Sequence, residues 1–434
     1  MSEPIVTAPR SRWRKALLVG LAALALPVII TAAIVLAVAG GGPVASPADV
    51  IGPPVRAGSA QGDRVYVLTS QWKTFRSAFR SSSTSYTDLY VDVWAFDAAD
   101  ARPVWRHRLA RDRSGVNMGR ALLGAQGGTL WALDPKGLVG LSLTDGAVVA
   151  DAARIEAANP GLKGLIPTEA SYFRFDAAGL AFTAADGRNW RLPNEGLKAE
   201  PATTAPAQAP VAGVVRPAHI AGGNGTYAFM ERGLSIGPRW LGLLDAEEAK
   251  TFAANGAIGG VDPASHPRMR LWRASIGSKP TFFGPKPTFG AFAPLPESPE
   301  FINSGLLSNG VTNSLPILLF RPDSVLVLHR DRLGDAGRLR LTRISGPAGK
   351  ALWTVELPMQ ALESVMPGEG SLVLLGARDE PGPRRGPNSR DTVSVDQLVA
   401  VDLASGRMGA YGFKVLATNP EKIPASSTNL AAAD

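Results

Sequence analysis

Residues Leu130–Val149 read LWALDPKGLVGLSLTDGAVV and decide the fold class. Apolar residues alternate with small or polar ones, and this pattern is interrupted at 135–137 (Pro-Lys-Gly) and at 144–146 (Thr-Asp-Gly). A period of two is that of a β-strand, and Pro, Gly and Asp are the residues of tight turns. The stretch therefore predicts short antiparallel strands joined by tight turns.

Similar stretches recur along the chain. The clearest are 90–109, 129–149, 337–357 and 395–411, with weaker copies at 180–192, 239–246 and 268–276. In the first half of the chain the strands end at Asp97, Ser142 and Thr183, which are 45 and 41 residues apart. Later equivalents near Asp245, Ser345 and Asp402 are spaced more widely, which indicates inserted loops. Propeller blades repeat at about 40–45 residues, so the spacing favours a β-propeller.

The physical chemistry of repeated hairpins favours a closed ring. Hairpins in series leave unpaired sheet edges, whereas radial repetition buries the faces between blades and leaves only short edges. We expect an all-β propeller of six to eight blades, seven being favoured, closed by pairing of strand 64–69 with the last blade. A β-sandwich is the alternative, but about 355 residues of hairpins is long for one.

The N-terminal segment determines on which side of a membrane the strands lie. Residues 16–40 hold no charge over 25 positions, and the basic run SRWRK precedes them. About 20 apolar residues span a bilayer, and a basic flank stays in the cytoplasm, so we predict a single N-terminal transmembrane helix. A cleaved signal peptide ending at Ala39 is the alternative, and both interpretations export the strands. The predicted parts are 1–15 (cytoplasmic), 16–40 (transmembrane helix), 41–62 (flexible tether), 63–418 (propeller) and 419–434 (tail).

Three phrases carry a resemblance to a known repeat: AFDAADARPVW, GPAGKALWTVEL and VAVDLASGR. They resemble the quinoprotein-like (PQQ-like) β-propeller repeat, with Asp97 and Asp402 on its aspartate and Trp105 and Trp353 on its tryptophan. The resemblance implies that these residues are structural, each tryptophan ring packing between blades while its N–H bonds to backbone; Trp272 is interpreted in the same way. A membrane helix followed by such a propeller also resembles bacterial inner-membrane-anchored proteins, which implies a periplasmic propeller.

The sequence shows no clear catalytic centre. Quinoprotein dehydrogenases hold their cofactor through calcium and an acidic and amide cluster, and many carry a vicinal disulfide. This chain has no cysteine and no dense Asp/Asn calcium loop. The four histidines, at 107, 219, 266 and 329, lack metal-ligand spacing, although His329 and Asp331 form a weak candidate for a base and its orienting group. We therefore predict no enzyme activity, no cofactor and no metal.

The charge of the exported part is modest. The chain carries +8, and residues 1–40 hold four cations against Glu3, which leaves +5 for the rest. Nucleic-acid binding requires a concentrated basic face, so we do not expect it.

Two segments are candidate interaction loops. The first interleaves cations with aromatic residues in a predicted hairpin loop that could meet anionic lipid or another acidic surface: Lys73, Phe75, Arg76, Phe79 and Arg80. The second, at 281–292, carries Phe282, Phe283, Phe289 and Phe292 among prolines, which suits a protein interface or a membrane surface. The alternative is that neither segment binds a partner. The first would then be a solvated loop, and the phenylalanines of the second would pack onto the propeller.

These features favour a binding module. A tethered disc with long loops suits a protein-interaction scaffold for an envelope partner. The alternatives are a sensor of small ligands or glycans in the central channel, or a propeller enzyme. Carboxylates clustered at the channel mouth would favour an enzyme, whereas an aromatic patch at the rim would favour a partner protein.

Overall fold

The structure of the chain is a computed structural model. It describes residues 44–79, 82–113, 120–176, 178–202, 233–236, 239–255, 267–281, 286–302, 317–320, 324–334, 337–345, 348–381, 392–414 and 427–430. The predicted cytoplasmic segment 1–15 and transmembrane helix 16–40 lie outside these residues. Within the described ranges no helix is long and apolar enough to span a membrane.

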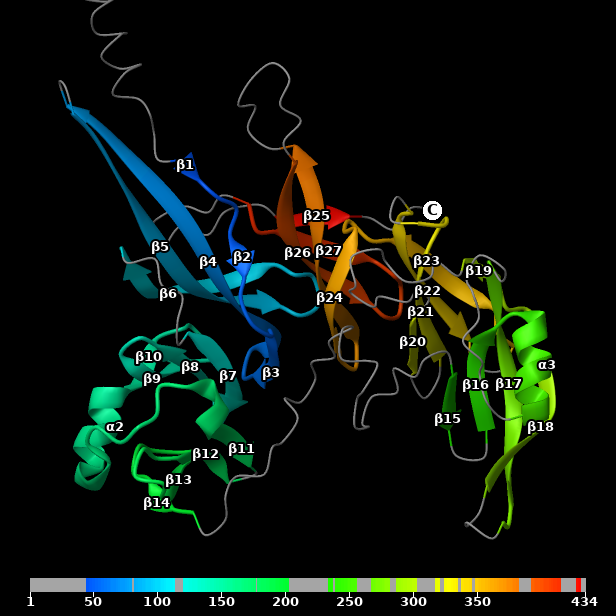
Figure 1. Ribbon diagram of the computed structural model, residues 1–434, viewed down its shortest axis with the longest axis horizontal. Helices are drawn as coiled ribbons and strands as arrows, with labels where there is room; N and C mark the ends of the chain where they lie inside the picture. The colour runs from blue at the N-terminus through cyan, green and yellow to red at the C-terminus, as the bar shows by residue number, and fades with distance from the viewer. Residues whose placement is uncertain are drawn as a thin grey trace, which may run out of the picture.

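The described residues form an all-β protein, as the alternating patterns predict. Consecutive strands pair antiparallel to give six meanders, numbered in chain order (Figure 1). Meander 1 contains β3 (Val55–Ser59), β4 (Gly62–Phe79), β5 (Ser82–Asp97) and β6 (Pro103–Asp112), with β1 (Val44–Ala45) and β2 (Asp49–Val50) also paired to β4. Meander 2 contains β7 (Ala121–Gln126), β8 (Thr129–Asp134), β9 (Gly137–Ser142) and β10 (Val148–Asp151).

Helix α2 (Ala152–Ala158) and two 3₁₀ turns, η1 (Pro160–Leu162) and η2 (Ala170–Tyr172), lead to meander 3. Meander 3 contains β11 (Phe173–Asp176), β12 (Gly179–Thr183), β13 (Asn189–Pro193) and β14 (Glu200–Pro201). Meander 4 contains β15 (Gly233–Ile236), β16 (Arg239–Leu244), β17 (Arg268–Lys279) and β18 (Lys286–Pro294), with helix α3 (Ala246–Asn255) between β16 and β17.

Meander 5 contains β20 (Ile317–Phe320), β21 (Ser324–Arg330), β22 (Leu339–Ser345) and β23 (Ala351–Glu356), and β19 (Phe301–Ile302) pairs with both β17 and β21. Meander 6 contains β24 (Ala361–Pro367), β25 (Ser371–Pro381), β26 (Thr392–Asp402), β27 (Met408–Gly412) and β28 (Ser427–Leu430). Strands β8, β9 and β10 occupy the alternating stretch around 130–149, with their turns at the two predicted breaks.

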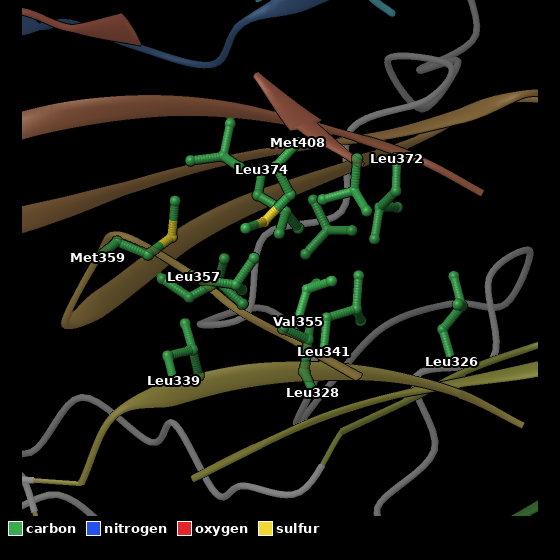
Figure 2. Close-up of a cluster of buried hydrophobic side chains, with 14 of the residues drawn as sticks. Leu326, Leu328, Leu339, Leu341, Val355, Leu357, Met359, Leu372, Leu374 and Met408 are labelled. Carbon is green, nitrogen blue, oxygen red and sulfur yellow. The ribbon is translucent and has the colours of Figure 1, made fainter. Parts of the chain in front are cut away.

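The meanders pack face to face through apolar clusters. Successive residues of a strand point to opposite faces, so one strand serves two clusters. In β4, Val65 and Val67 pack toward meander 6, whereas Tyr66 and Leu68 pack toward meander 2. Figure 2 shows the cluster between meanders 5 and 6, where Leu328 and Leu341 face Leu374 and Met408. The clusters place the meanders in the order 3, 2, 1, 6, 5, 4.

The first and last meanders therefore lie next to each other. The rings of Trp94 and Phe96 pack against Tyr411 and Phe413, with centroids 4.9 to 6.5 Å apart. Strand pairing does not join them, contrary to expectation, because residues 64–69 pair with β2, β3 and β5. Both edges of β4 are already occupied there, so the joint forms between sheet faces.

Hydrogen bonds from the N-terminal strands reinforce this joint. The Arg56 guanidinium donates from Nη1 to the Met366 carbonyl at 2.7 Å and from Nη2 to Ser371 Oγ at 2.8 Å. The Val50 amide donates to Asp396 Oδ2 at 2.6 Å. Segment 41–62, expected as a flexible tether, thus contains the paired strands β1 to β3, because the long edge of β4 offers backbone groups that need partners. The expected tail 419–434 likewise contains β28, which pairs with β27.

The ring expected from the sequence is not closed within the described residues. No apolar cluster there joins meander 3 to meander 4. On the face of meander 4 that turns away from meander 5, Ala249 and Phe252 of α3 pack instead. The described residues form six meanders, whereas the sequence favoured seven blades, and the number of blades stays a prediction.

One turn recurs in four meanders. The amide of Ser142 donates to the Ala147 carbonyl, and the Gly146 amide donates back to the Ser142 carbonyl. The same pair of bonds forms in the turns that begin at Asp97, Ser345 and Asp402. The fifth residue of the turn has a left-handed φ, which explains its glycine; meander 1 has Ala101 there, at φ 57°. At the expected equivalent Asp245 a helix begins instead, and the Asp245 carboxylate accepts from the amides at the start of α3.

In two of these turns a tryptophan of the preceding meander packs on the glycine. Trp105 Nε1 donates to the Leu143 carbonyl at 3.2 Å, and Trp353 Nε1 donates to the Leu403 carbonyl at 3.4 Å. Trp272 differs, since it bonds to the Leu244 carbonyl of its own meander. Trp105 and Trp353 therefore connect neighbouring meanders at corresponding positions.

Replacing Gly146 with Ala is expected to lower the free energy of unfolding by about 2–5 kcal/mol. The left-handed φ of 73° costs an L-residue about 1–2 kcal/mol. The new methyl would lie 2.6 Å from the Trp105 ring, which adds an overpacking cost of about 1–3 kcal/mol. Gly187→Ala is the matched control, because its φ is 81° with nothing within 4 Å of the new methyl. Urea denaturation measures both; equal losses would show that the ring contact contributes nothing.

Asp396 should make the joint between meanders 1 and 6 pH-dependent. Burial raises the pKa of this carboxyl, the Val50 amide lowers it, and the charge of Asp49 raises it. A raised folded-state pKa favours the protonated form, so its stabilisation is lost as pH rises through that pKa. Asp396→Asn should therefore gain stability relative to wild type as pH rises above about 4, the ordinary pKa of an aspartate. Melting temperatures of both proteins at a series of pH values from about 4 upward test it, and a difference that is constant or falls would contradict it.

Candidate interaction surfaces

The hairpin of β4 and β5 projects beyond meander 1. Strand β6 pairs with β5 only as far as Leu89, and β1 pairs with β4 only as far as Thr74. Beyond these points, among the described residues, 75–79 pair only with 82–86. We call this outer part the projecting hairpin; it is the long two-stranded arm in blue in Figure 1. The segment expected as a hairpin loop, 73–80, is thus almost entirely strand, which suits its Thr and Phe residues.

Aromatic and cationic side chains share one face of this hairpin. Phe75 stacks on Tyr86 across the two strands, with centroids 5.0 Å apart and an interplanar angle of 16°. The Arg113 guanidinium lies 4.9 Å from the centroid of the Tyr86 ring, within cation–π range. Tyr86 remains 42% exposed. Of the sequence-predicted residues here, the side chains of Arg76 and Phe79 and all of Arg80 lie outside the described part, so their role stays a prediction.

Buried charges hold the base of the hairpin to β6. Asp92 is 1% exposed and accepts from Arg106 Nε at 3.0 Å, while Arg108 also pairs with it. Asp88 is fully buried and accepts from Arg111 Nε at 2.9 Å. Both carboxylates lie an even number of residues from Tyr86 along β5, so both side chains point to the face that carries Tyr86.

The Tyr90 ring lies among the cations of this cluster. The cationic groups of Lys73, Arg108 and Arg111 are 4.6 to 5.5 Å from its centroid, and its hydroxyl is 3.3 Å from Asp88 Oδ2. Lys73, predicted to be a surface contact, is only 4% exposed. Burial and the nearby Arg106 and Arg108 lower its pKa. Lys73 therefore belongs to the base of the hairpin and not to its exposed surface.

Most of this cluster was not predicted from the sequence, although a signal was present. The run WRHRLARDR at 105–113 places three arginines in one strand and a fourth directly after it, and YTDLYVDV at 86–93 carries Asp88 and Asp92. Opposite charges on adjacent strands pair only in the correct register. The sequence alone does not give the register of the two strands, so it does not show which of these charges meet.

A second surface lies on meander 4, where five aromatic rings gather. Trp240 and Phe252 have centroids 4.5 Å apart, Phe252 and Phe289 4.6 Å, and Trp272 and Phe292 5.3 Å. Trp240 and Phe252 are buried, whereas the other three rings are half-buried. We call these five residues the aromatic cluster. The sequence predicted Phe289 and Phe292 as interaction residues; they pack here within the chain, and Phe282 and Phe283 lie outside the described residues.

A β-bulge brings the two phenylalanines together. Residues three apart in a regular strand point to opposite faces. In β18, however, Gly290 pairs with Ser275 and Ala293 pairs with Arg273, so two residues oppose the single Ala274. The extra residue, Ala291, has a left-handed φ of 47°. Phe289 and Phe292 consequently join the same cluster.

The described residues hold little that resembles a catalytic centre. They contain no group of three or more His, Cys, Asp or Glu placed to bind a metal. His329 Nε2 lies 2.8 Å from Thr342 Oγ1, and burial lowers its pKa to about 4. Asp331 pairs with Arg338 and Arg340, so it does not orient His329 as the sequence suggested. Burial also lowers the pKa of His107, and His219 and His266 lie outside the described residues.

The class of protein that these observations define is an all-β protein of antiparallel meanders packed face to face. No protein-family model and no curated protein matches the chain. Among solved structures, the crystal structure of BamB from Moraxella catarrhalis aligns with 90% of this chain and 92% of that chain, at 12% identity and a TM-score of 0.17. At this TM-score we derive neither the fold nor the function of the chain from the match.

Replacing Asp92 with Asn should destabilise meander 1 by about 3–5 kcal/mol, since it removes the carboxylate from the buried Arg106. The matched control is Arg102→Gln, because Arg102 is 64% exposed and its ion pairs with Asp97 and Asp100 are 3.8 Å long. We expect that control to change stability by about 0.5 kcal/mol or less. Urea denaturation measures both, and a similar small loss in each would contradict a structural role for the buried pair.

Proposed function

We propose that this chain is a β-propeller anchored in the bacterial inner membrane through residues 16–40, with its meanders in the periplasm, and that it is a non-catalytic protein-interaction scaffold. The 25 uncharged residues and their basic flank support the anchor. The packing of meander 1 on meander 6 supports the propeller, because a ring places the first and last blades side by side.

The aromatic cluster is the observation that carries the scaffold role. Tryptophan and phenylalanine are enriched at protein interfaces, and the strongest contributions come from rings held in place before binding. In the aromatic cluster, the rings of Trp240 and Phe252 are buried. They pack against the other three rings, which are half-buried, and hold them in place. A partner would complete the burial of these three rings with little loss of side-chain entropy.

The position of the cluster suits this role. Meander 4 is the last member of the packed series within the described residues, and its other face is buried against meander 5. The cluster therefore rests on a supported sheet. A rigid surface binds more tightly than a loop that must be ordered on binding.

Crosslinked affinity purification of the full-length protein from its native membrane tests this proposal. Wild type is expected to retain an envelope protein reproducibly. Ala291→Pro should reduce its recovery roughly tenfold or more, because proline fixes φ near −65° and would displace Phe292 from the cluster. Ala291→Gly is the matched control, since glycine adopts the left-handed φ freely and should keep the partner.

Two results would contradict the scaffold role. One is the absence of any partner above background with a folded, correctly located wild type. The other is equal recovery with Ala291→Pro and Ala291→Gly when circular dichroism shows both to be folded, which would remove the aromatic cluster from the interface.

A further inference from the structure

We propose that the projecting hairpin lies against the anionic surface of the same membrane that holds residues 16–40. The inference rests on the anchor of the proposed function. It adds a second point of contact, which would fix the orientation of the meanders above the bilayer.

The path of the chain is the first argument. Strand β1 runs antiparallel to β4, with Ala45 opposite Lys73 and Val44 opposite Thr74. Residue numbers in β4 increase toward the tip of the hairpin. Reading β1 backward, from Ala45 to Val44, therefore leads toward the tip, so the chain enters meander 1 from the side to which the hairpin projects.

The available lengths are the second argument. From Gly40, the end of the predicted span, to Val44 is four residues, which reach about 14 Å when fully extended. From Thr74, level with Val44, to Phe79 is five residues of strand, or about 17 Å. The headgroup layer is about 5–7 Å thick. A hairpin standing along the membrane normal therefore reaches that layer even when the connection is fully extended.

The chemistry of the hairpin is the third argument. Residues 75–86 carry two cations, Arg76 and Arg80, and no acidic residue. Arg113, on the chain that follows β6, adds an exposed cation beside the exposed Tyr86 ring. The nearest carboxylates are already engaged, since the buried Asp88 pairs with Arg111 and, at 3.5 Å, with Arg113 itself, and Asp112 pairs with Arg120. Tyrosine and arginine together suit a membrane interface that carries anionic lipid.

This contact would also separate two roles in space. The projecting hairpin and meander 4 lie at opposite ends of the long axis of the molecule (Figure 1). With the hairpin against the lipid, the aromatic cluster remains available to a protein partner.

The absence of cysteine allows a direct test on the full chain. Ser83→Cys, at the tip of the hairpin, is labelled with a fluorophore, and the protein is reconstituted into nanodiscs that contain a headgroup-spin-labelled quencher lipid. Ala185→Cys, on an exposed turn of meander 3, is the matched control position. We expect strong quenching at 83 with about 30% phosphatidylglycerol, weak quenching at 185, and loss of the difference in phosphatidylcholine alone or at high salt.

A charge variant tests the cause of the contact. Arg113→Gln in the Ser83→Cys background should weaken membrane contact of the tip about fivefold, the effect of one cation near an anionic surface. Arg102→Gln, in a distant turn, should leave the quenching unchanged.

The outcomes distinguish this inference from the proposed function. Release of the full chain by alkaline carbonate would overturn the anchor and this inference together. Retention of the chain with equal, weak quenching at 83 and 185 would overturn the membrane contact alone. Protection of the label at 83 by a co-purified protein, without quenching by lipid, would also overturn it and assign the hairpin to a protein partner.

Discussion

The packing of the first meander on the last is the contact on which the arrangement of the others depends. It joins residues more than 300 positions apart, such as Arg56 with Met366 and Val50 with Asp396. All other neighbours in the packed series are consecutive along the chain. Without this joint no apolar cluster among the described residues would connect meanders 1 to 3 with meanders 4 to 6, and the buried aromatic group of Trp94, Phe96, Tyr411 and Phe413 would be exposed.

The strand period of two makes such a series possible. Because alternate residues go to opposite faces, a single meander supplies apolar side chains to the neighbours on both of its sides. The recurring turn adds a specific contact at two of the boundaries, where Trp105 and Trp353 each pack on a left-handed glycine and bond to a carbonyl of the next meander. Area burial and a directional hydrogen bond therefore act at the same place.

The two candidate surfaces are built on this frame in different ways. Charge supports the projecting hairpin: Asp88 and Asp92 are buried at its base and are compensated by arginines of β6. Local backbone geometry supports the aromatic cluster, since the left-handed Ala291 brings Phe292 to the same face as Phe289. Each surface presents aromatic side chains that the chain itself holds in position, and such preorganisation favours binding.

The sequence by itself determined the all-β class and the turns that begin at Asp97, Ser142, Ser345 and Asp402, because alternation, Gly and Asp act through local backbone preferences. Only the tertiary structure decided that β1, β2 and β3 pair with β4, that Lys73 is buried and that residues 73–79 extend a strand. Those outcomes depend on which backbone edge is free and which charges meet across strands, and neither is encoded within a short window. The bulge at Ala291 is of the same kind, since an alanine gives no local sign that it will adopt a left-handed φ. The role of two phenylalanines three residues apart was therefore settled by strand register and not by composition.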